Sequence, residues 1–330
     1  MWNTKGRATR PRRVVYFGIL VCLGSALLGC GETSFSFPQC GGDALFFSTR
    51  GPSGESVQLI CPDGSQPQTF LASTSTHGFF YAQGWSLNAA ILVLAEDVPS
   101  TPGPFPLHLY LYRPAQRQLT RMTMQDGTEG FGALSPDSKR AVYEFVPNGG
   151  AIQTELWVKE LTAGQELQLT TQTQPRTDDV FPVWRPDGQE VWFIREVFPP
   201  DFSSVTTTLM REGASGGQPS VVLGADQAVD GVAFSASGDR FAARAAQGLE
   251  IVDATTLQAS IILPQSAFSG MSFNQGTLFW SADRYLLAFV ATVPHTNQQE
   301  IWTVRPDGTG LKMIHSENAL VMYLGGFVQP

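Results

Sequence analysis

Short apolar runs separated by turn-forming residues occupy the chain from about residue 40 onwards. The stretch Pro182–Arg195, PVWRPDGQEVWFIR, shows the unit, in which an apolar run, a Pro-Asp-Gly turn and a second apolar run follow one another. Apolar runs of this length bounded by turn residues are typical of strands, and Pro followed by Asp-Gly has the chemistry of a tight turn. No window of 11 residues shows convincing helical periodicity. The pattern therefore predicts an all-β protein built from hairpins.

The same unit recurs at a nearly constant spacing. The residues that stand in the place of Pro186 in the other copies are Leu87, Pro136, Ala236 and Ala282. Consecutive copies are 49, 50, 50 and 46 residues apart, and each is followed by a second pair of short strands. Four short strands in a period of nearly 50 residues, with Gly, Pro and Asp turns between them, are typical of a β-propeller blade.

The two ends of the repeat region complement each other. Residues 322–330 resemble the first half of a copy, whereas residues 43–48 and 56–60 resemble a blade that lacks its first strand. We therefore expect residues 40–330 to form a six-bladed propeller of four-stranded blades, with the C-terminal strand completing the N-terminal blade. Such closure removes two open sheet edges. Residues 34–38 are the competing candidate for that strand, but they are shorter and fit the repeat less well.

The first 29 residues have a different character. Five basic residues precede an apolar run, Val14–Leu28, which is too short for a permanent membrane span and is typical of a secretory signal. The run ends in Leu27-Leu28-Gly29-Cys30, which resembles a bacterial lipobox. The resemblance implies cleavage before Cys30, a diacylglycerol on its thiol and an acyl chain such as palmitate on its amine, with residues 30–39 as a tether. Leu28 departs mildly from the lipobox pattern, and an ordinary cleaved signal is the alternative.

Charge and cysteine content narrow the picture further. The residue after the expected lipidation site is Gly31, not Asp, and the lipobox resemblance therefore implies an outer-membrane destination. Removal of the leader leaves 16 basic and 29 acidic residues, a net charge of −13 against −8 for the whole chain, which argues against nucleic acid as a partner. Cys40 and Cys61 remain in an oxidising compartment, and a disulfide that closes their loop of about 20 residues would contribute roughly 3 kcal/mol. A metal pair is disfavoured because no third and fourth ligands stand nearby.

The most complete copy of the repeat carries a family resemblance. Residues 181–188, FPVWRPDG, are followed by Val191-Trp192-Phe193, and two copies end in Leu-Thr at residues 119–120 and 169–170. These features resemble the WD40-like Pro-Asp repeat (PD40) of TolB-type propellers, over roughly residues 40–330. The resemblance implies the propeller fold and says little about function, because the repeat is mostly scaffold.

Catalytic motifs are scarce in the chain. The four histidines, His77, His108, His295 and His315, stand far apart in the repeat, so we expect surface or turn positions for them and no metal cluster. Neither a Gly-x-Ser-x-Gly elbow nor a phosphate-binding loop is present. The tryptophans that fall on expected strands are interpreted as packing between blades, not as a platform for carbohydrate. They are Trp85, Trp157, Trp184, Trp192, Trp280 and Trp302.

Acidic residues precede the first strands of successive blades. They are Asp126, Glu129, Asp178, Asp179, Asp226 and Asp230. These segments meet at one mouth of a propeller's channel, so they predict an acidic funnel for a cation or a basic segment of a partner, with turn chemistry as the alternative. Two proline-rich insertions, residues 97–106 and 197–202, should project from one face. Phe105, Phe198 and Phe202 could form an apolar contact surface there, with ordinary loop variation as the alternative.

Together these features predict a lipid-anchored, non-catalytic binding platform in the bacterial envelope. Its partner would be an envelope protein or polymer, and no cofactor is expected. The alternative is a propeller-type metal-dependent lactonase or lyase that uses the acidic mouth, with Ca²⁺ as the metal considered. A structural role in a larger envelope assembly is the third interpretation. The oligomeric state is left open.

Overall fold

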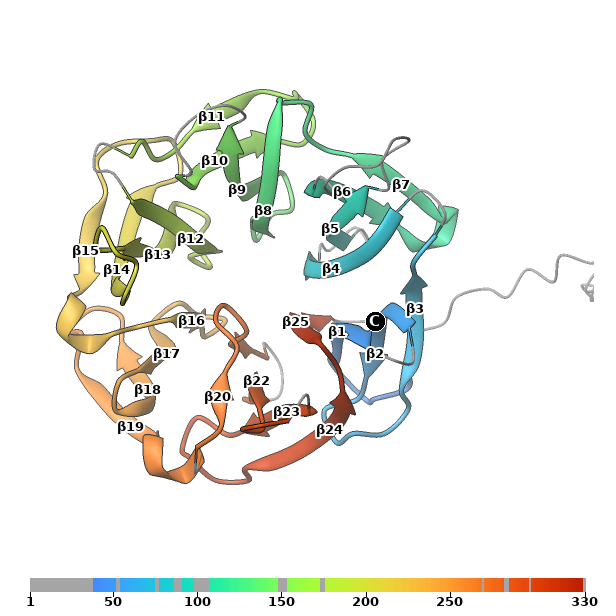
Figure 1. Cartoon of the computed structure of the whole chain (residues 1–330), viewed down its shortest axis with the longest axis vertical. Coiled ribbons are helices and arrows are strands. Elements are labelled where there is room, and N and C mark those ends of the chain that lie inside the picture. Colours follow the sequence, from blue (N-terminus) through green and yellow to red (C-terminus); the bar gives the residue numbers. More distant parts are fainter. Residues whose placement is uncertain are drawn as a thin grey trace, which may run out of the picture. The chain divides into compact units, whose positions relative to one another are not determined.

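The computed structural model describes residues 38–51, 54–74, 77–85, 91–97, 107–147, 153–172, 176–268, 270–281, 285–296 and 298–328. The chain divides into Met1–Ser34 and Phe35–Pro330, and every described residue belongs to the second unit. That unit is a ring of six antiparallel sheets around a central axis (Figure 1), which confirms the predicted six-bladed propeller. Helical structure in the described residues is limited to the 3-10 turns Pro114–Gln116, Ala225–Gln227 and Gln265–Phe268.

In each of the first three blades, four strands follow one another from the channel outwards. Blade 1 contains β25 (Val321–Val328), β1 (Ala44–Gly51), β2 (Gly54–Ile60) and β3 (Gln68–Ala72). Blade 2 contains β4 (His77–Trp85), β5 (Ile91–Asp97), β6 (Leu107–Arg113) and β7 (Gln118–Arg121). Blade 3 contains β8 (Gly127–Leu134), β9 (Arg140–Pro147), β10 (Glu155–Glu160) and β11 (Glu166–Gln168).

The other three blades follow the same order, with one irregularity in blade 6. Blade 4 contains β12 (Thr177–Trp184), β13 (Glu190–Val197), β14 (Thr206–Gly213) and β15 (Ser220–Leu223). Blade 5 contains β16 (Gly231–Phe234), β17 (Arg240–Ala245), β18 (Gly248–Asp253) and β19 (Ala259–Pro264). In blade 6 the inner position is divided between β20 (Ser272–Phe273) and β21 (Phe279–Trp280), followed by β22 (Leu287–Thr292), β23 (Gln298–Val304) and β24 (Lys312–Asn318).

The ring closes between the two ends of the repeat region. β25 pairs antiparallel with β1, from Ala44 opposite Val328 to Arg50 opposite Val321, and the two strands lie side by side in Figure 1. The C-terminal strand therefore completes the N-terminal blade, as predicted. Residues 34–37 of the competing segment lie outside the described residues.

The apolar core is divided into six clusters, one between each pair of neighbouring blades. In β13, Val191 and Phe193 pack against blade 3, whereas Trp192 and Ile194 pack against blade 5. A strand that is buried on both faces reads as a continuous apolar run. This is the physical reason for the sequence VWFI in the most complete copy.

The tryptophans largely occupy the expected positions. Trp192 and Trp184 are buried, which confirms the predicted role in packing between blades for these two. Trp157, Trp280 and Trp302 are half-buried, and the side chain of Trp85 lies outside the described residues.

The turns that end the inner strands of blades 3 and 4 contact each other. The guanidinium of Arg140 donates a hydrogen bond to the carbonyl of Gly188 (2.7 Å) and lies 4.7 Å from the centre of the Trp184 ring. Gly188 has a φ of +68°, a conformation that favours glycine. The Pro-Asp-Gly turn of blade 4 is thereby linked to blade 3.

Two further Pro-Asp-Gly turns, on the outer strands, have a separate packing role. A side chain at Gly64 or Gly308 would bring its Cβ to 2.6 or 2.5 Å from a carbonyl oxygen of the preceding blade, that of Ile314 or Ile262. These glycines therefore permit the outer turns to lie directly on the neighbouring outer strand.

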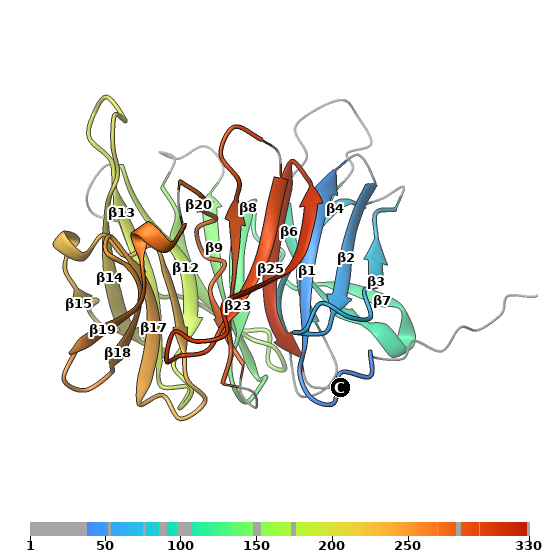
Figure 2. The ribbon, with the colours of Figure 1, turned by 90° about the horizontal axis from the view of Figure 1, so that it is seen from below.

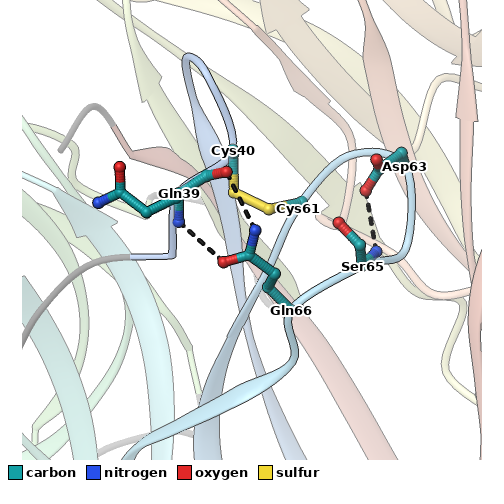
Figure 3. Close-up of a disulfide and its surroundings, with 6 residues drawn as sticks. All are labelled: Gln39, Cys40, Cys61, Asp63, Ser65 and Gln66. Atoms are coloured by element: carbon teal, nitrogen blue, oxygen red, sulfur yellow. Dashed lines mark hydrogen bonds between the residues drawn. A yellow bond between two sulfur atoms is a disulfide. The ribbon is translucent and has the colours of Figure 1, made fainter.

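The predicted disulfide is present and fastens the start of the propeller (Figure 3). Cys40 and Cys61 are bonded with a Cα–Cα distance of 5.3 Å. Gln66 strengthens this link, because its side chain accepts a hydrogen bond from the backbone N–H of Gln39 (2.9 Å) and donates one to the Gln39 carbonyl (3.1 Å). Within the described part of the chain no helix has the length and apolar character of a membrane span.

Candidate functional site

All inner strands begin at one end of the channel, which we call the mouth face. Because β1 runs antiparallel to β25, the chain enters the propeller near Ala44 at the opposite end (Figure 2). The connection between β13 and β14 also lies on the mouth face, where it projects beyond the ring (Figure 2). The segments that carry the predicted acidic residues and the second predicted loop therefore share one face.

Aromatic side chains from four inner strands meet in the channel. Tyr81 comes from β4, Phe131 from β8, Phe181 from β12 and Tyr323 from β25. Their ring centres are 5.1 Å apart for Tyr81–Tyr323 and Phe131–Tyr323, 5.6 Å for Phe131–Phe181 and 6.3 Å for Tyr81–Phe131. These distances are those of contacting aromatic pairs. Below the rings, a cavity of only about 70 Å³ remains.

Glu144, on β9, organises this aromatic cluster. The inner strands β8 and β12 contain bulges at Phe131 and Phe181, where the strand pairing skips residues. Each bulge turns a backbone N–H away from the sheet, and Glu144 accepts both, from Phe131 (3.0 Å) and from Phe181 (2.7 Å). Phe181 has a φ of +53°, a strained conformation for a residue other than glycine. A side chain at Gly130 would collide with the Glu144 carboxylate, so this glycine makes room for it.

Blade 6 contributes a loop to the channel in place of a continuous inner strand. Residues 274–278 separate β20 from β21, and the backbone of Gly276 packs so closely on Phe181 that any side chain there would collide with its ring. The loop is held by Asn274, whose side chain donates hydrogen bonds to Gln299 (2.8 Å) and to the Met322 carbonyl (3.0 Å). Sequence reasoning did not identify this loop.

Two pockets on the mouth face share residues of this aromatic cluster. The central pocket, of about 430 Å³, is lined among others by Phe131, Phe181, Asn274, Gln275, Gln299 and Tyr323. The side pocket, of about 270 Å³, lies between blades 2 and 3 and shares Phe131 and Tyr323 with the central one. Glu129 and Glu144 are among its lining residues. Both pockets are therefore built over the same aromatic cluster.

Two of the predicted acidic residues form ion pairs within their own blades. Asp179 is fully buried and receives two hydrogen bonds from Arg195, at 2.7 and 2.8 Å, and the hydrogen bond to Asp179 raises the pKa of Arg195. Asp230 pairs with Arg244. Burial raises the pKa of Asp230 and lowers that of Arg244, so desolvation outweighs the attraction between the two. For these residues the structure supports a role in holding the strands.

The other four predicted acids are placed differently. Glu129 is buried, and its Oε2 lies 3.0 Å from His108 Nδ1 and accepts the Leu109 N–H at 2.8 Å. Asp178 is half-buried and accepts the Thr154 N–H at 2.7 Å. Asp126 and Asp226 are exposed and line neither mouth pocket. The funnel predicted from the sequence thus divides into buried, half-buried and exposed residues.

Two glutamates on second strands belong to the mouth and were missed by sequence reasoning. Burial raises the pKa of Glu144 to about 8, and the charges of Glu196 and Asp178 add to this. Burial likewise raises the pKa of Glu196, with contributions from Asp178 and Asp230. The cluster that the structure assembles is therefore Glu144, Asp178, Glu196 and Asp230. Its sequence signal is an acid inside an apolar strand, as in AVYEFV around Glu144.

The β13–β14 connection carries two of the predicted contact residues. The rings of Phe198 and Phe202 lie 5.9 Å apart, and Phe202 remains 64% exposed. Val197 and Val205, on either side of the loop, are 42% and 41% exposed. The third predicted residue, Phe105, and its insertion lie outside the described residues, as does Cys30.

The histidines do not all lie at the surface, and the prediction for His108 was wrong. Its ring is buried beside Glu129, because the inner strand of blade 3 brings a carboxylate against the third strand of blade 2. His77 packs against Phe80 and Tyr110. Among the described residues, no three His, Cys, Asp or Glu side chains are arranged to hold a metal ion.

Similarity to known proteins is visible in structure only. No protein-family model and no curated protein sequence matches the chain. The structure is similar to that of TolB from Acinetobacter baumannii, with a TM-score of 0.63 and 17% identity over 88% of this chain and 68% of that one. It is also similar to the propeller of a nidogen/laminin complex (TM-score 0.58, 10% identity, 87% and 97% covered). An oligogalacturonate lyase in complex with manganese gives a TM-score of 0.51 at 16% identity, with 83% and 73% covered. At these identities the likeness establishes the propeller fold.

Proposed function

We propose that the protein is a lipid-anchored, non-catalytic binding platform of the bacterial cell envelope, and that its partner binds at the mouth face. One observation carries the proposal: the two pockets, the acidic cluster and the exposed Phe202 lie on this face, and the chain enters at the other end. Exposed apolar residues beside polar groups are typical of interaction sites. The similar propeller of the nidogen/laminin complex belongs to a complex of two proteins, which supports a protein as partner.

The chemistry of the mouth favours a partner with a basic segment. Glu144, Asp178, Glu196 and Asp230 are close enough for their charges to influence one another, and the whole chain carries a net charge of −8. Complementary charge speeds encounter and selects the partner, while buried apolar contacts supply most of the affinity. Phe198 and Phe202 would provide such contacts next to the acidic cluster.

Attachment through Cys30 fits this arrangement. Eight residues, 30–37, lie between the lipidated end and Pro38, and a fully extended segment of that length spans at most about 28 Å. Mass spectrometry of the N-terminal peptide tests the anchor: we expect an acylated Cys30, and a Cys30→Ser variant should leave the outer-membrane fraction. An unmodified Cys30 in the membrane fraction would contradict it.

Site-specific photocrosslinking in cells tests the platform. A crosslinker would replace Phe202 or Leu320, which are 64% and 67% exposed on the mouth face. The matched control is Leu257, which is 39% exposed in the β18–β19 turn of the opposite face. We expect recurrent crosslinks to one protein from the two mouth positions and none from Leu257. Equal crosslinking from all three positions, or none from the mouth at good expression, would contradict the proposal.

A metal-dependent lactonase or lyase is the second candidate. The structural similarity to a lyase that was solved with manganese favours it. Its test is turnover of a lactone and oligogalacturonate panel with added Ca²⁺ or Mn²⁺. Metal-dependent turnover that is lost when Asp178 and Glu196 are both replaced by their amides would support the enzyme and reject the platform as the main activity.

A further inference from the structure

We infer that the side pocket between blades 2 and 3 binds the charged end of a lysine or arginine side chain. The inference rests on the proposed function for the identity of the partner as a protein, and it adds the chemistry of one contact. The pocket, the faces of its aromatic rings and one incompletely bonded carboxylate each point to such a group.

The size and walls of the pocket suit a single side chain. Its volume of about 270 Å³ is below the roughly 300–1,000 Å³ of typical small-molecule pockets. Leu94, Leu107 and Val146 form apolar walls, and Tyr81, Phe131 and Tyr323 add aromatic surface. The methylene groups of a basic side chain pack well on such walls, and a cation is attracted to the face of an aromatic ring.

The charge of the pocket has one sign. Glu129 and Glu144 are its two ionisable acids, and none of the described residues that line it is Lys, Arg or His. Both oxygens of Glu144 accept backbone N–H groups, so neither oxygen is left open for a ligand. Glu129 is different, because only its Oε2 is engaged, by His108 and Leu109.

The strongest indication of a ligand is the Oε1 atom of Glu129. It is shielded from solvent, and no hydrogen-bond partner for it exists in the described structure, although the residue is only 1% exposed. A buried acceptor without a donor is costly, and an ionised donor makes the strongest hydrogen bond to a carboxylate. An ammonium or guanidinium that enters the pocket would supply this donor. A metal ion fits less well, because Ca²⁺ takes six to eight oxygen ligands and most of the lining is apolar.

Methyl NMR on the full-length protein in detergent tests the inference directly. The probes are Nα-acetyl-lysine methylamide and Nα-acetyl-arginine methylamide, with the uncharged Nα-acetyl-norleucine methylamide as control. We expect saturable shifts of the Leu94, Leu107 and Val146 methyl signals with at least one cationic probe and none with norleucine. Glu129→Gln should weaken binding about ten- to hundredfold, because it replaces a charge-assisted hydrogen bond by a neutral one.

The matched control variant is Glu212→Gln. Glu212 is also a buried carboxylate, but it lies on β14 of blade 4 and is absent from the pocket lining, so its replacement should leave probe binding unchanged. If Glu129→Gln fails to fold, Phe131→Leu serves instead, with a severalfold loss expected because one aromatic face is removed.

Three results would overturn the inference: no saturable shift of the pocket methyls with either cation, equal shifts with norleucine, or wild-type affinity in a folded Glu129→Gln variant. The probes need no partner protein, so the outcome is separate from that of the crosslinking experiment. If the side pocket binds the lysine or arginine probe but no partner protein is crosslinked, the inference is supported and the proposed binding-platform function is rejected.

Discussion

Glu129 and Asp179 hold the same place in consecutive blades, as third residues of the inner strands β8 and β12, and both are buried. Their surroundings differ. Asp179 receives two hydrogen bonds from the guanidinium of Arg195, on the neighbouring strand of its own blade. The Oε2 of Glu129 instead meets His108 and a backbone N–H of the preceding blade, and its Oε1 stays without a partner in the described residues.

The comparison shows that one repeat position can serve two purposes. In blade 4, the charge of Asp179 is neutralised by Arg195 of the same blade, and the pair links β12 to β13. On the blade 3 side, the carboxylate reaches across to another blade, where a pocket forms beside it. A buried charge with a full partner is structural, whereas one with an open acceptor next to a cavity can recruit a ligand.

The largest expected effect is the loss of stability when the Asp179–Arg195 ion pair is broken. Arg195→Met leaves Asp179 buried without its partner, which should lower the free energy of unfolding by about 3–5 kcal/mol. Urea unfolding measures this. The double variant Asp179→Asn/Arg195→Met removes both charges and should recover a large part of the loss. A cost below about 1 kcal/mol for Arg195→Met would show that the two sides do not differ in this way.

The second prediction concerns pH on the pocket side. Burial raises the pKa of Glu144 to about 8, whereas an exposed Glu titrates near about 4.3. The folded protein therefore keeps a proton that the unfolded chain releases, so the free energy of unfolding should fall as pH rises from about 5 to 8. This group contributes a slope of up to about 1.4 kcal/mol per pH unit.

Urea unfolding of Glu144→Gln across this pH range measures that slope, which should flatten by about one proton. Glu212→Gln is the comparison, because burial raises the pKa of Glu212 to about 7. Its replacement should therefore flatten the curve below pH 7 and leave the decline between pH 7 and 8. An unchanged decline between pH 7 and 8 in Glu144→Gln would contradict the prediction.

The smallest expected effect comes from the replacement of Asp178. Its charge raises the pKa of both Glu144 and Glu196. In Asp178→Asn, the fall of the free energy of unfolding with rising pH should therefore end at a lower pH than in the wild type. At pH 6 the stability should change by only about 1 kcal/mol or less, because the Asn oxygen can still accept the Thr154 N–H. If this decline ends at the same pH in the variant and the wild type, the mouth carboxylates do not influence one another.

The sequence predicted the scaffold well because the scaffold is repetitive. The apolar strand runs and the spacing near 50 residues report local preferences that recur along the repeat, and the Pro-Asp turn marks its two most complete copies. The half-copies at the two ends predicted closure, which β25 and β1 confirm. The disulfide was predicted from the expected export of the chain and from the two cysteines that the expected processing would leave free, and the structure contains it.

The predicted site was only partly assembled. Asp178 and Asp230 do join one acidic cluster, but Asp126 and Asp226 remain exposed and outside both pockets. The loop at residues 274–278 was missed because nothing in its local sequence breaks a strand as strongly as a proline would. It fills the channel only because Gly276 can approach Phe181 of a blade on the far side of blade 5.

By itself the sequence determined the repeat, the number of blades and the face on which the inner strands begin, because these depend on turn chemistry and on burial periods of a few residues. Only the tertiary structure decided which charges meet. The partner of Asp179 lies 16 residues away in its own blade, but Glu144 joins bulges from two blades, and Glu129 faces His108 of a third strand. Which residues of different blades come into contact depends on how twisted sheets pack in a ring, and no local sequence pattern encodes this packing.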